Sequence, residues 1–199
     1  MLHLARPRMV AHGIAAAGLA SAALMALALT GCGSGNAINT GPFGNGSDPS
    51  SVCGPSAPGG VVTDGMVGLV NSGHSVAVVE RVTLHDPRHL VIVGAWVVPI
   101  NNTQYYGVFQ GWPQGRAPRG VKWSQAVRAA GARVPPARGR HSADLVVVLK
   151  LIGAKGTARN IDVFYRESGQ QYHLQYNSSI GLTRAPTCNL KVPAPTRAG

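Results

Sequence analysis

One short segment carries residue types that transition-metal ions prefer. His85 and His89 flank Asp86, so two imidazoles and a carboxylate fall within five residues, a set that could supply ligands for zinc or copper. An i, i+4 pair shares one face only in a helix, and Pro87 disfavours a helix at this point. Asp-Pro is instead a turn signal between two strands, so we expect no metal site here.

A second segment carries the residue types of a hydrolytic triad. His141, Ser142 and Asp144 lie close together in the sequence. Adjacency in sequence is not triad geometry, however, and the chain has no Gly-x-Ser-x-Gly motif, Walker loop, GxGxxG or EF-hand loop. We therefore expect no catalytic residue and no cofactor, and the protein is not expected to be an enzyme.

The charge balance also argues against a catalytic or metal centre built from carboxylates. The chain has 199 residues with 18 Lys and Arg but only 7 Asp and Glu, a formal net charge of +11. The chain therefore has few carboxylates from which an acidic metal site or a multi-carboxylate catalytic centre could be built. A hydrophobic content of 45% argues against a disordered chain, and the length suits one ordinary domain.

The N-terminus has the pattern of a secretory signal peptide. Arg6 and Arg8 precede an uncharged stretch from Ile14 to Leu29 that consists almost wholly of Ala, Leu, Gly and Met. The stretch from Ile14 to Leu29 has 16 residues, fewer than the roughly 20 that a stable transmembrane helix needs. As a helix it would be about 24 Å long, shorter than the hydrocarbon core of about 30 Å. A permanent span is not expected.

The residues that follow carry a resemblance to a known family. Leu29-Thr30-Gly31-Cys32 resembles the lipobox of bacterial lipoproteins, in which small residues precede a cysteine that becomes the mature N-terminus. The resemblance implies that Cys32 receives a diacylglyceryl group and that cleavage removes residues 1–31. It also implies that the protein is anchored to the cell membrane on its extracytoplasmic face, because two acyl chains hold a protein there durably. The alternative is an ordinary secreted protein with a chance cysteine.

The other two cysteines are candidates for a disulfide. An extracytoplasmic compartment permits a bridge between Cys53 and Cys188, which would tie the two ends of the domain together. The alternative is two free thiols. No CxxC motif is present, so a redox role has little support.

Composition divides the chain into four parts. A signal peptide is expected over residues 1–31, and a lipid-anchored flexible linker rich in Gly, Ser, Asn and Pro over 32–60. A β-sandwich domain is expected over 61–190, followed by a disordered tail over 191–199. The linker is expected to reach about 30 Å.

Alternating apolar residues predict many short strands. In the stretch 76–84 the even positions are apolar except at Glu80, which we expect either to form an ion pair with an arginine or to be turned outward by a β-bulge. Residues 66–71 are a shorter apolar run that could form a hairpin with this strand. Apolar runs at 90–98 and 145–152 suit central strands, and residues 161–166 and 172–176 flank a Ser168-Gly169 turn.

These elements predict an all-β fold, an antiparallel β-sandwich with one short helix in a long loop. The stretch LVNSGHSVAVVERVTL resembles the early strands of immunoglobulin-like extracytoplasmic domains, which implies that topology for the sandwich. A small closed barrel is the alternative.

The long segment between Pro99 and His141 is basic and aromatic. No acidic residue lies between Asp86 and Asp144, whereas eight Lys or Arg residues do, interleaved with Tyr, Phe and Trp. Trp123, Ala126, Val127 and Ala130 at i, i+3, i+4 and i+7 predict a short amphipathic helix that ends at Gly131.

We interpret this segment as a docking surface for an anionic partner, because guanidinium groups grip phosphate and carboxylate while aromatic rings supply contact area. The partner would be anionic lipid, an anionic wall polymer or an acidic protein, but not nucleic acid, for which no binding motif is present. Two alternatives stay open, a solvated loop without a partner and a small-ligand or metal carrier. The candidate partner-binding residues are Arg116, Arg119, Lys122, Arg128, Trp112 and Trp123.

Overall fold

The computed structural model describes residues 41–44, 50–100, 105–113, 121, 123–137 and 143–194. All of them belong to the second of two compact units, Asn36–Gly199. They form strands and two short 3-10 helices, so the all-β prediction is confirmed. The elements are η1 (Gly41–Phe43), β1 (Ser50–Pro55), β2 (Val61–Leu69), β3 (Ala77–His85), β4 (Leu90–Pro99), β5 (Gly107–Gln110), η2 (Trp123–Gln125), β6 (Val127–Arg128), β7 (Arg133–Val134), β8 (Ala143–Leu151), β9 (Lys155–Ala158), β10 (Asn160–Glu167), β11 (Gln170–Tyr176) and β12 (Ser178–Thr183).

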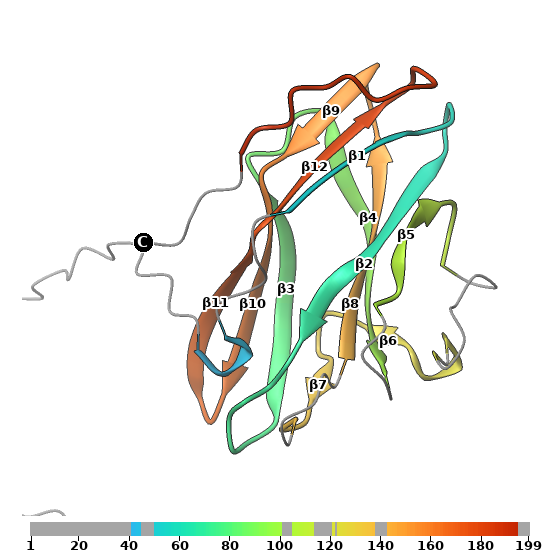
Figure 1. Ribbon diagram of the computed structural model, residues 1–199. Coiled ribbons are helices and arrows are strands. Elements are labelled where there is room, and N and C mark those ends of the chain that lie inside the picture. The colour runs from blue at the N-terminus through green and yellow to red at the C-terminus, as the bar shows by residue number, and fades with distance from the viewer. Residues whose placement is uncertain are drawn as a thin grey trace, which may run out of the picture. The chain divides into compact units, whose positions relative to one another are not determined.

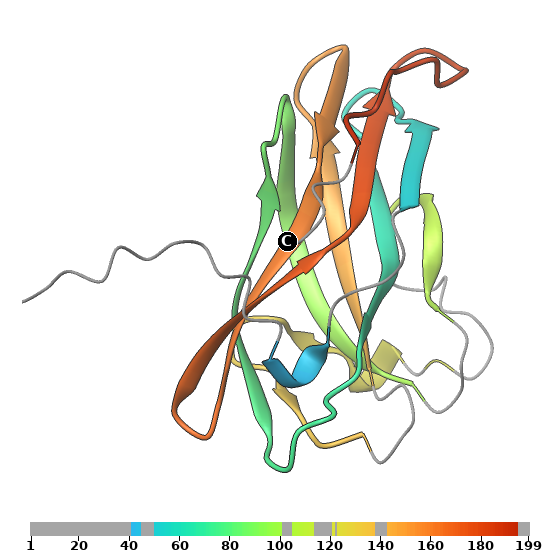
Figure 2. The same cartoon turned by 60° about the vertical axis from the view of Figure 1, so that its left-hand side comes forward.

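The strands form three hydrogen-bonded sheets, with the orders β1-β12-β9, β11-β10-β3-β7 and β5-β2-β8-β4-β6. Only Arg159 separates β9 from β10, and only Asn177 separates β11 from β12. These four strands therefore form one long twisted ribbon, which crosses the domain diagonally in Figure 2 and joins the first two sheets. Paired strands are antiparallel, except that β1 runs parallel to β12.

The main hydrophobic core lies between this ribbon with its neighbours and the five-stranded sheet (Figure 1). Its largest fully buried side chains include Tyr165, Leu174 and Ile180 from the ribbon, and Leu145 and Leu149 from β8. In β8 every residue except Lys150 is buried. The prediction of central strands from the apolar runs is therefore confirmed, and the architecture is sandwich-like.

The strand that contains residues 66–69 does not form a hairpin with the next strand, so that prediction is wrong. β2 pairs with β5 and β8, whereas β3 pairs with β10 and β7 in another sheet. Buried Asn71 explains the crossing, because its side-chain amide donates to the carbonyl oxygens of Ser75 at 2.8 Å and Val134 at 2.9 Å. The connection is thus fastened to the opposite sheet rather than folded back as a tight turn.

Glu80 interrupts the alternation of β3. Arg81 pairs with Phe164 and Val79 with Tyr165, so Glu80 is an additional residue on β3, a β-bulge. Before the bulge the odd-numbered Val79 is fully buried, and after it even-numbered residues face the core. The predicted inward face was therefore wrong for the first half of the strand. Glu80 also forms the expected ion pair, with Arg166 Nη2 at 3.0 Å from its Oε1.

The amphipathic helix predicted from Trp123 to Ala130 is also wrong. One 3-10 turn, η2, is followed by the two-residue strand β6, which pairs with β4. Val127, expected on the apolar face of a helix, is 49% exposed. Pairing with the edge of the sheet therefore outweighs the helical spacing of the apolar residues. Gly131 does mark the turn, with φ of +84°.

Part of the range expected as a tether packs on the sandwich. Phe43 is buried and stacks on Tyr165 with 4.0 Å between ring centroids, and its N–H donates to Tyr165 Oη at 3.1 Å. β1 pairs with β12 along its whole length. The chain therefore enters the fold before residue 61. Of the predicted tail, residues up to 194 lie among those described.

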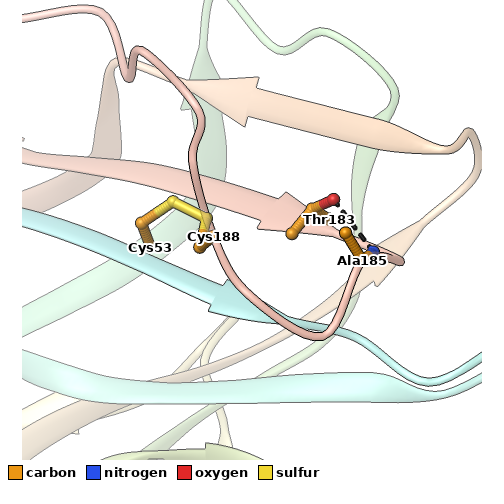
Figure 3. Close-up of a disulfide and its surroundings, with 4 residues drawn as sticks. All are labelled: Cys53, Thr183, Ala185 and Cys188. Carbon is orange, nitrogen blue, oxygen red and sulfur yellow. Dashed lines mark hydrogen bonds between the residues drawn. A yellow bond between two sulfur atoms is a disulfide. The ribbon is translucent and has the colours of Figure 1, made fainter.

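The predicted bridge between Cys53 and Cys188 is confirmed (Figure 3). It joins β1 to the segment that follows β12, in which the Ala185 N–H donates to Thr183 Oγ1 at 3.1 Å. The predicted acylation site, Cys32, lies outside the described residues. No helix in the described part of the chain is long and apolar enough to span a membrane.

Candidate functional site

The five-stranded sheet carries a second apolar cluster on the face that points away from the main core. Alternate residues of β4 and β8 explain it, because Trp96 and Val98 face this side while Val97 faces the main core. Residues of the basic segment between Pro99 and His141 cover this cluster. The other buried members of the cluster are Ile100, Tyr106, Val121, Val146 and Val148, and Val61, Phe109, Trp123 and Ala126 are partly buried against them.

Tyr106 fastens the basic segment to the sheet. Its N–H donates to Asp144 Oδ2 at 2.8 Å, and its hydroxyl donates to the Pro113 carbonyl at 2.6 Å. Burial raises the pKa of Tyr106 to about 12, so the phenol stays neutral and remains a donor. Both ends of the stretch from 106 to 113 are thereby held at fixed positions.

Trp96 lies at the centre of a group of aromatic rings. Trp112 meets it edge-on, with centroids 6.2 Å apart and planes at 82°, and Trp123 lies at 5.5 Å. Tyr106 also contacts Trp123, at 5.8 Å. Aromatic pairs in such geometries contribute about 0.5–1.5 kcal/mol beyond the area they bury.

Arg128 lies over the same ring. Its Cζ is 4.6 Å from the Trp96 centroid, within cation–π range, and the two residues are direct partners on β6 and β4. Among the described residues Arg128 has no ion-pair partner, as expected from the lack of acidic residues in this part of the sequence. The set of Trp96, Trp112, Trp123 and Arg128 is called the Arg–aromatic face below.

The rings of this face differ in exposure. Trp96 is only 8% exposed, whereas Trp112 is 46% exposed. The buried ring supports the structure, and the exposed ring together with the guanidinium presents an apolar and cationic surface to solvent. Such a surface can bind anionic groups by charge and cover apolar area at the same time.

The structure therefore brings together three of the six predicted partner-binding residues, namely Trp112, Trp123 and Arg128, around Trp96. The other three, Arg116, Arg119 and Lys122, lie outside the described residues, although in sequence they fall between Pro113 and Trp123. Trp96 was not among the residues predicted for this site. Its position could have been inferred from the sequence. Trp96 is next to Val97 in an apolar strand, and neighbouring residues of a strand face opposite sides of the sheet.

The structure describes the first of the two sequence segments considered for chemistry and only part of the second. The His85 Nδ1 atom lies 3.4 Å from Asp162 Oδ2, whereas His89 lines a separate pocket. Within the described ranges no group of three or more His, Cys, Asp and Glu side chains could hold a metal ion. Asp144 is fully buried beneath Tyr106, and His141 and Ser142 lie outside the described residues.

The sheet that contains β3, β10 and β11 also carries an arginine over an aromatic ring on its outer face. Arg81 lies 4.1 Å from the Phe164 centroid, and Phe164 stacks on His173 at 4.4 Å with parallel planes. His173 Nε2 in turn lies 3.1 Å from Asp162 Oδ1. This face therefore combines cations with carboxylates, unlike the Arg–aromatic face.

Comparison with models of known protein families gives no match to this chain, and comparison with curated proteins gives none either.

Proposed function

We propose that this protein is a bacterial lipoprotein, anchored through Cys32 to the extracytoplasmic face of the cell membrane, whose β-sandwich is a non-enzymatic binding module for an anionic partner. The observation that carries the proposal is the Arg–aromatic face. The Arg128 guanidinium, which has no ion-pair partner among the described residues, lies over the Trp96 ring, and the half-exposed Trp112 packs against the same ring. The finer fold we propose is immunoglobulin-like. Its support is the packing of largely antiparallel sheets around one core.

The partner that suits this surface best is the anionic headgroup layer of the membrane. Trp side chains are enriched at membrane interfaces, and each basic residue near an anionic membrane contributes about 1 kcal/mol. Arg116, Arg119 and Lys122 add further positive charge within the same stretch of sequence. An acylated Cys32 would keep the domain permanently close to the membrane lipids.

The anchor is tested by intact-mass spectrometry of the protein from the membrane fraction of its native host. The expected mass begins at Cys32, includes a diacylglyceryl group and contains one disulfide. An unacylated protein recovered from the medium would overturn the anchor and leave the binding surface to be judged by itself.

The binding surface is tested with protein that begins at residue 32 and carries Cys32→Ser, so that it lacks both the proposed acylation site and the apolar stretch within residues 1–31. We expect it to sediment with phosphatidylglycerol vesicles at low salt and to be released as salt rises, and not to bind phosphatidylcholine vesicles. Arg128→Glu removes one positive charge and adds a negative one, so binding should fall on the order of tenfold or more.

Arg81→Glu is the matched control. Arg81 is also exposed and also stacks on an aromatic ring, but it lies on the outer face of the other layer. Its loss should leave vesicle binding within about twofold of the starting protein, apart from the small effect of net charge. Equal losses in the two variants would contradict the proposed face. Binding to isolated wall material or an acidic protein, with no binding to vesicles, would contradict the choice of lipid as the partner.

A further inference from the structure

A second basic site lies at the end of the sandwich that is uppermost in Figure 1, where β9 and the C-terminal segment meet the turn between β3 and β4. It is a pocket of about 410 Å³. This volume is within the range of small-molecule sites. The lining residues are Arg88, His89, Lys155, Gly156, Thr157, Leu190, Lys191 and Pro193.

The charges of this pocket are of one sign. Arg88, Lys155 and Lys191 come from three separate segments, and none of the lining residues is acidic. The nearest carboxylate in sequence, Asp86, is engaged elsewhere, with Arg159 Nε at 3.3 Å and His85 Nε2 at 4.0 Å. Three cations that line one pocket repel one another, and an anion with two negative charges would relieve that repulsion.

Two walls of the pocket are fixed by the backbone. Arg88 and Thr157 exchange two hydrogen bonds, N to O at 2.7 Å and 2.9 Å, and the Ile152 N–H donates to the His89 carbonyl at 3.0 Å. His89 is held at φ of +54°, a left-handed conformation that is unfavourable for a non-glycine residue. The surrounding contacts therefore determine the position of the turn.

Gly156 is required for this close approach. A Cβ at that position would lie 2.8 Å from the Arg88 carbonyl oxygen and 2.9 Å from that of His89. Only glycine lets the turn lie directly on β9. The floor of the pocket is thus built from backbone and does not depend on the conformation of a flexible side chain.

The third wall is the C-terminal segment. The disulfide of Cys188 with Cys53 holds it against β1 just before Leu190 (Figure 3). Val192 lies on β12, since a Cβ added to Gly181 would be 2.7 Å from Val192 Cγ2. Leu190 and Pro193 give this wall an apolar surface beside the ammonium group of Lys191.

We propose that this pocket binds a small organic phosphate, with the dianionic group among Arg88, Lys155 and Lys191 and the organic part against Leu190 and Pro193. A guanidinium matches two phosphate oxygens at once, and the two lysines add point charges. The site shares no residue with the Arg–aromatic face, so the inference does not depend on the proposed function. It gives the ligand-carrier alternative a definite location and a chemical class.

The probe is phenyl phosphate, titrated calorimetrically into the full-length protein. Saturable one-to-one binding is expected, while phenol should not bind and inorganic phosphate should bind at least several-fold more weakly because it leaves the apolar wall uncovered. The variant Lys155→Glu with Lys191→Glu should weaken phenyl phosphate binding by at least tenfold. Both side chains are exposed, so the domain is expected to stay folded.

Arg133→Glu is the control, because this exposed residue pairs with Val78 near the start of β3, whereas the pocket lies beyond the end of that strand. It should bind phenyl phosphate as the starting protein does. Vesicles of phosphatidylglycerol should not compete, which separates a free organic phosphate from a lipid headgroup. The proposal is overturned if phenyl phosphate does not saturate the protein, if vesicles compete fully, or if Arg133→Glu weakens binding as much as the double variant.

Discussion

Arg128 and Trp96 are paired residues on neighbouring strands, and the guanidinium carbon of Arg128 lies 4.6 Å from the Trp96 ring centroid. The pairing fixes a cation from the long basic segment to a strand of the sheet. The charge is therefore displayed at a defined position over the ring that exposed Trp112 also contacts. A freely solvated loop would give neither the fixed position nor the aromatic neighbour.

The exposed and buried rings of this face should differ sharply in their effect on stability. Trp96→Ala should lower the free energy of unfolding by about 3–5 kcal/mol, because it empties the centre of a buried cluster. Trp112→Ala should cost about 1 kcal/mol or less, because the ring is half exposed. Urea unfolding measures both. A Trp112 variant as unstable as the Trp96 variant would show that Trp112 is a structural residue rather than a contact residue.

Asp64 should make the protein less stable as the pH rises. Its side chain is fully buried on β2, and Met66 N–H donates to Oδ1 at 3.0 Å. Within the part of the chain that the structure describes, Oδ2 has no hydrogen-bond partner. Burial raises its pKa from 3.8 to about 6, partly offset by that hydrogen bond. The folded state thus binds the proton more tightly than the unfolded state does.

Stability from this group is therefore present below about pH 4 and is lost as the pH rises through 6, a change of about 3 kcal/mol. Asp64→Asn should remove this dependence and be more stable than the starting protein at pH 7.5. The measurement is the denaturant midpoint at several pH values between 4 and 8. Parallel pH profiles for the two proteins would contradict the assignment.

The disulfide should contribute substantially to stability. Cys53 and Cys188 are separated by 135 residues, and closing a loop of that length stabilises the fold by roughly 5 kcal/mol in the chain-entropy model. Replacing both cysteines with serine should lower the free energy of unfolding by about 2–5 kcal/mol. Reduced and alkylated protein should lose a similar amount, whereas a loss below about 1 kcal/mol would mean that β1 and the C-terminal segment are held by packing alone.

Much of the fold followed from local patterns. Strands β4 and β8 were predictable because both of their faces are apolar, which is typical of a central strand. The hairpin of β10 and β11 was predictable because Ser168-Gly169 is a turn signal between an apolar run and an alternating one, and both residues adopt the positive φ of a tight turn.

Other features depend on partners that a single strand does not reveal. A bulge at Glu80 was one of two expectations from the sequence, but only the register against β10 shows where the faces of β3 exchange. The crossing after Leu69 depends on hydrogen bonds of Asn71 to distant carbonyls. β6 has only two residues, too few for any periodicity. The basic segment was predicted as the candidate site, but the central role of Trp96 required knowledge of which face of β4 the segment covers.

The central claim is that the Arg–aromatic face lies against anionic lipid. The most direct test uses the Cys32→Ser protein without residues 1–31. Its tryptophan fluorescence is measured on phosphatidylglycerol vesicles that contain brominated acyl chains, which quench only rings close to the lipid. The account predicts quenching that falls in Trp112→Phe and disappears in high salt. Equal emission with brominated and ordinary vesicles at low salt, with the protein bound, would contradict it.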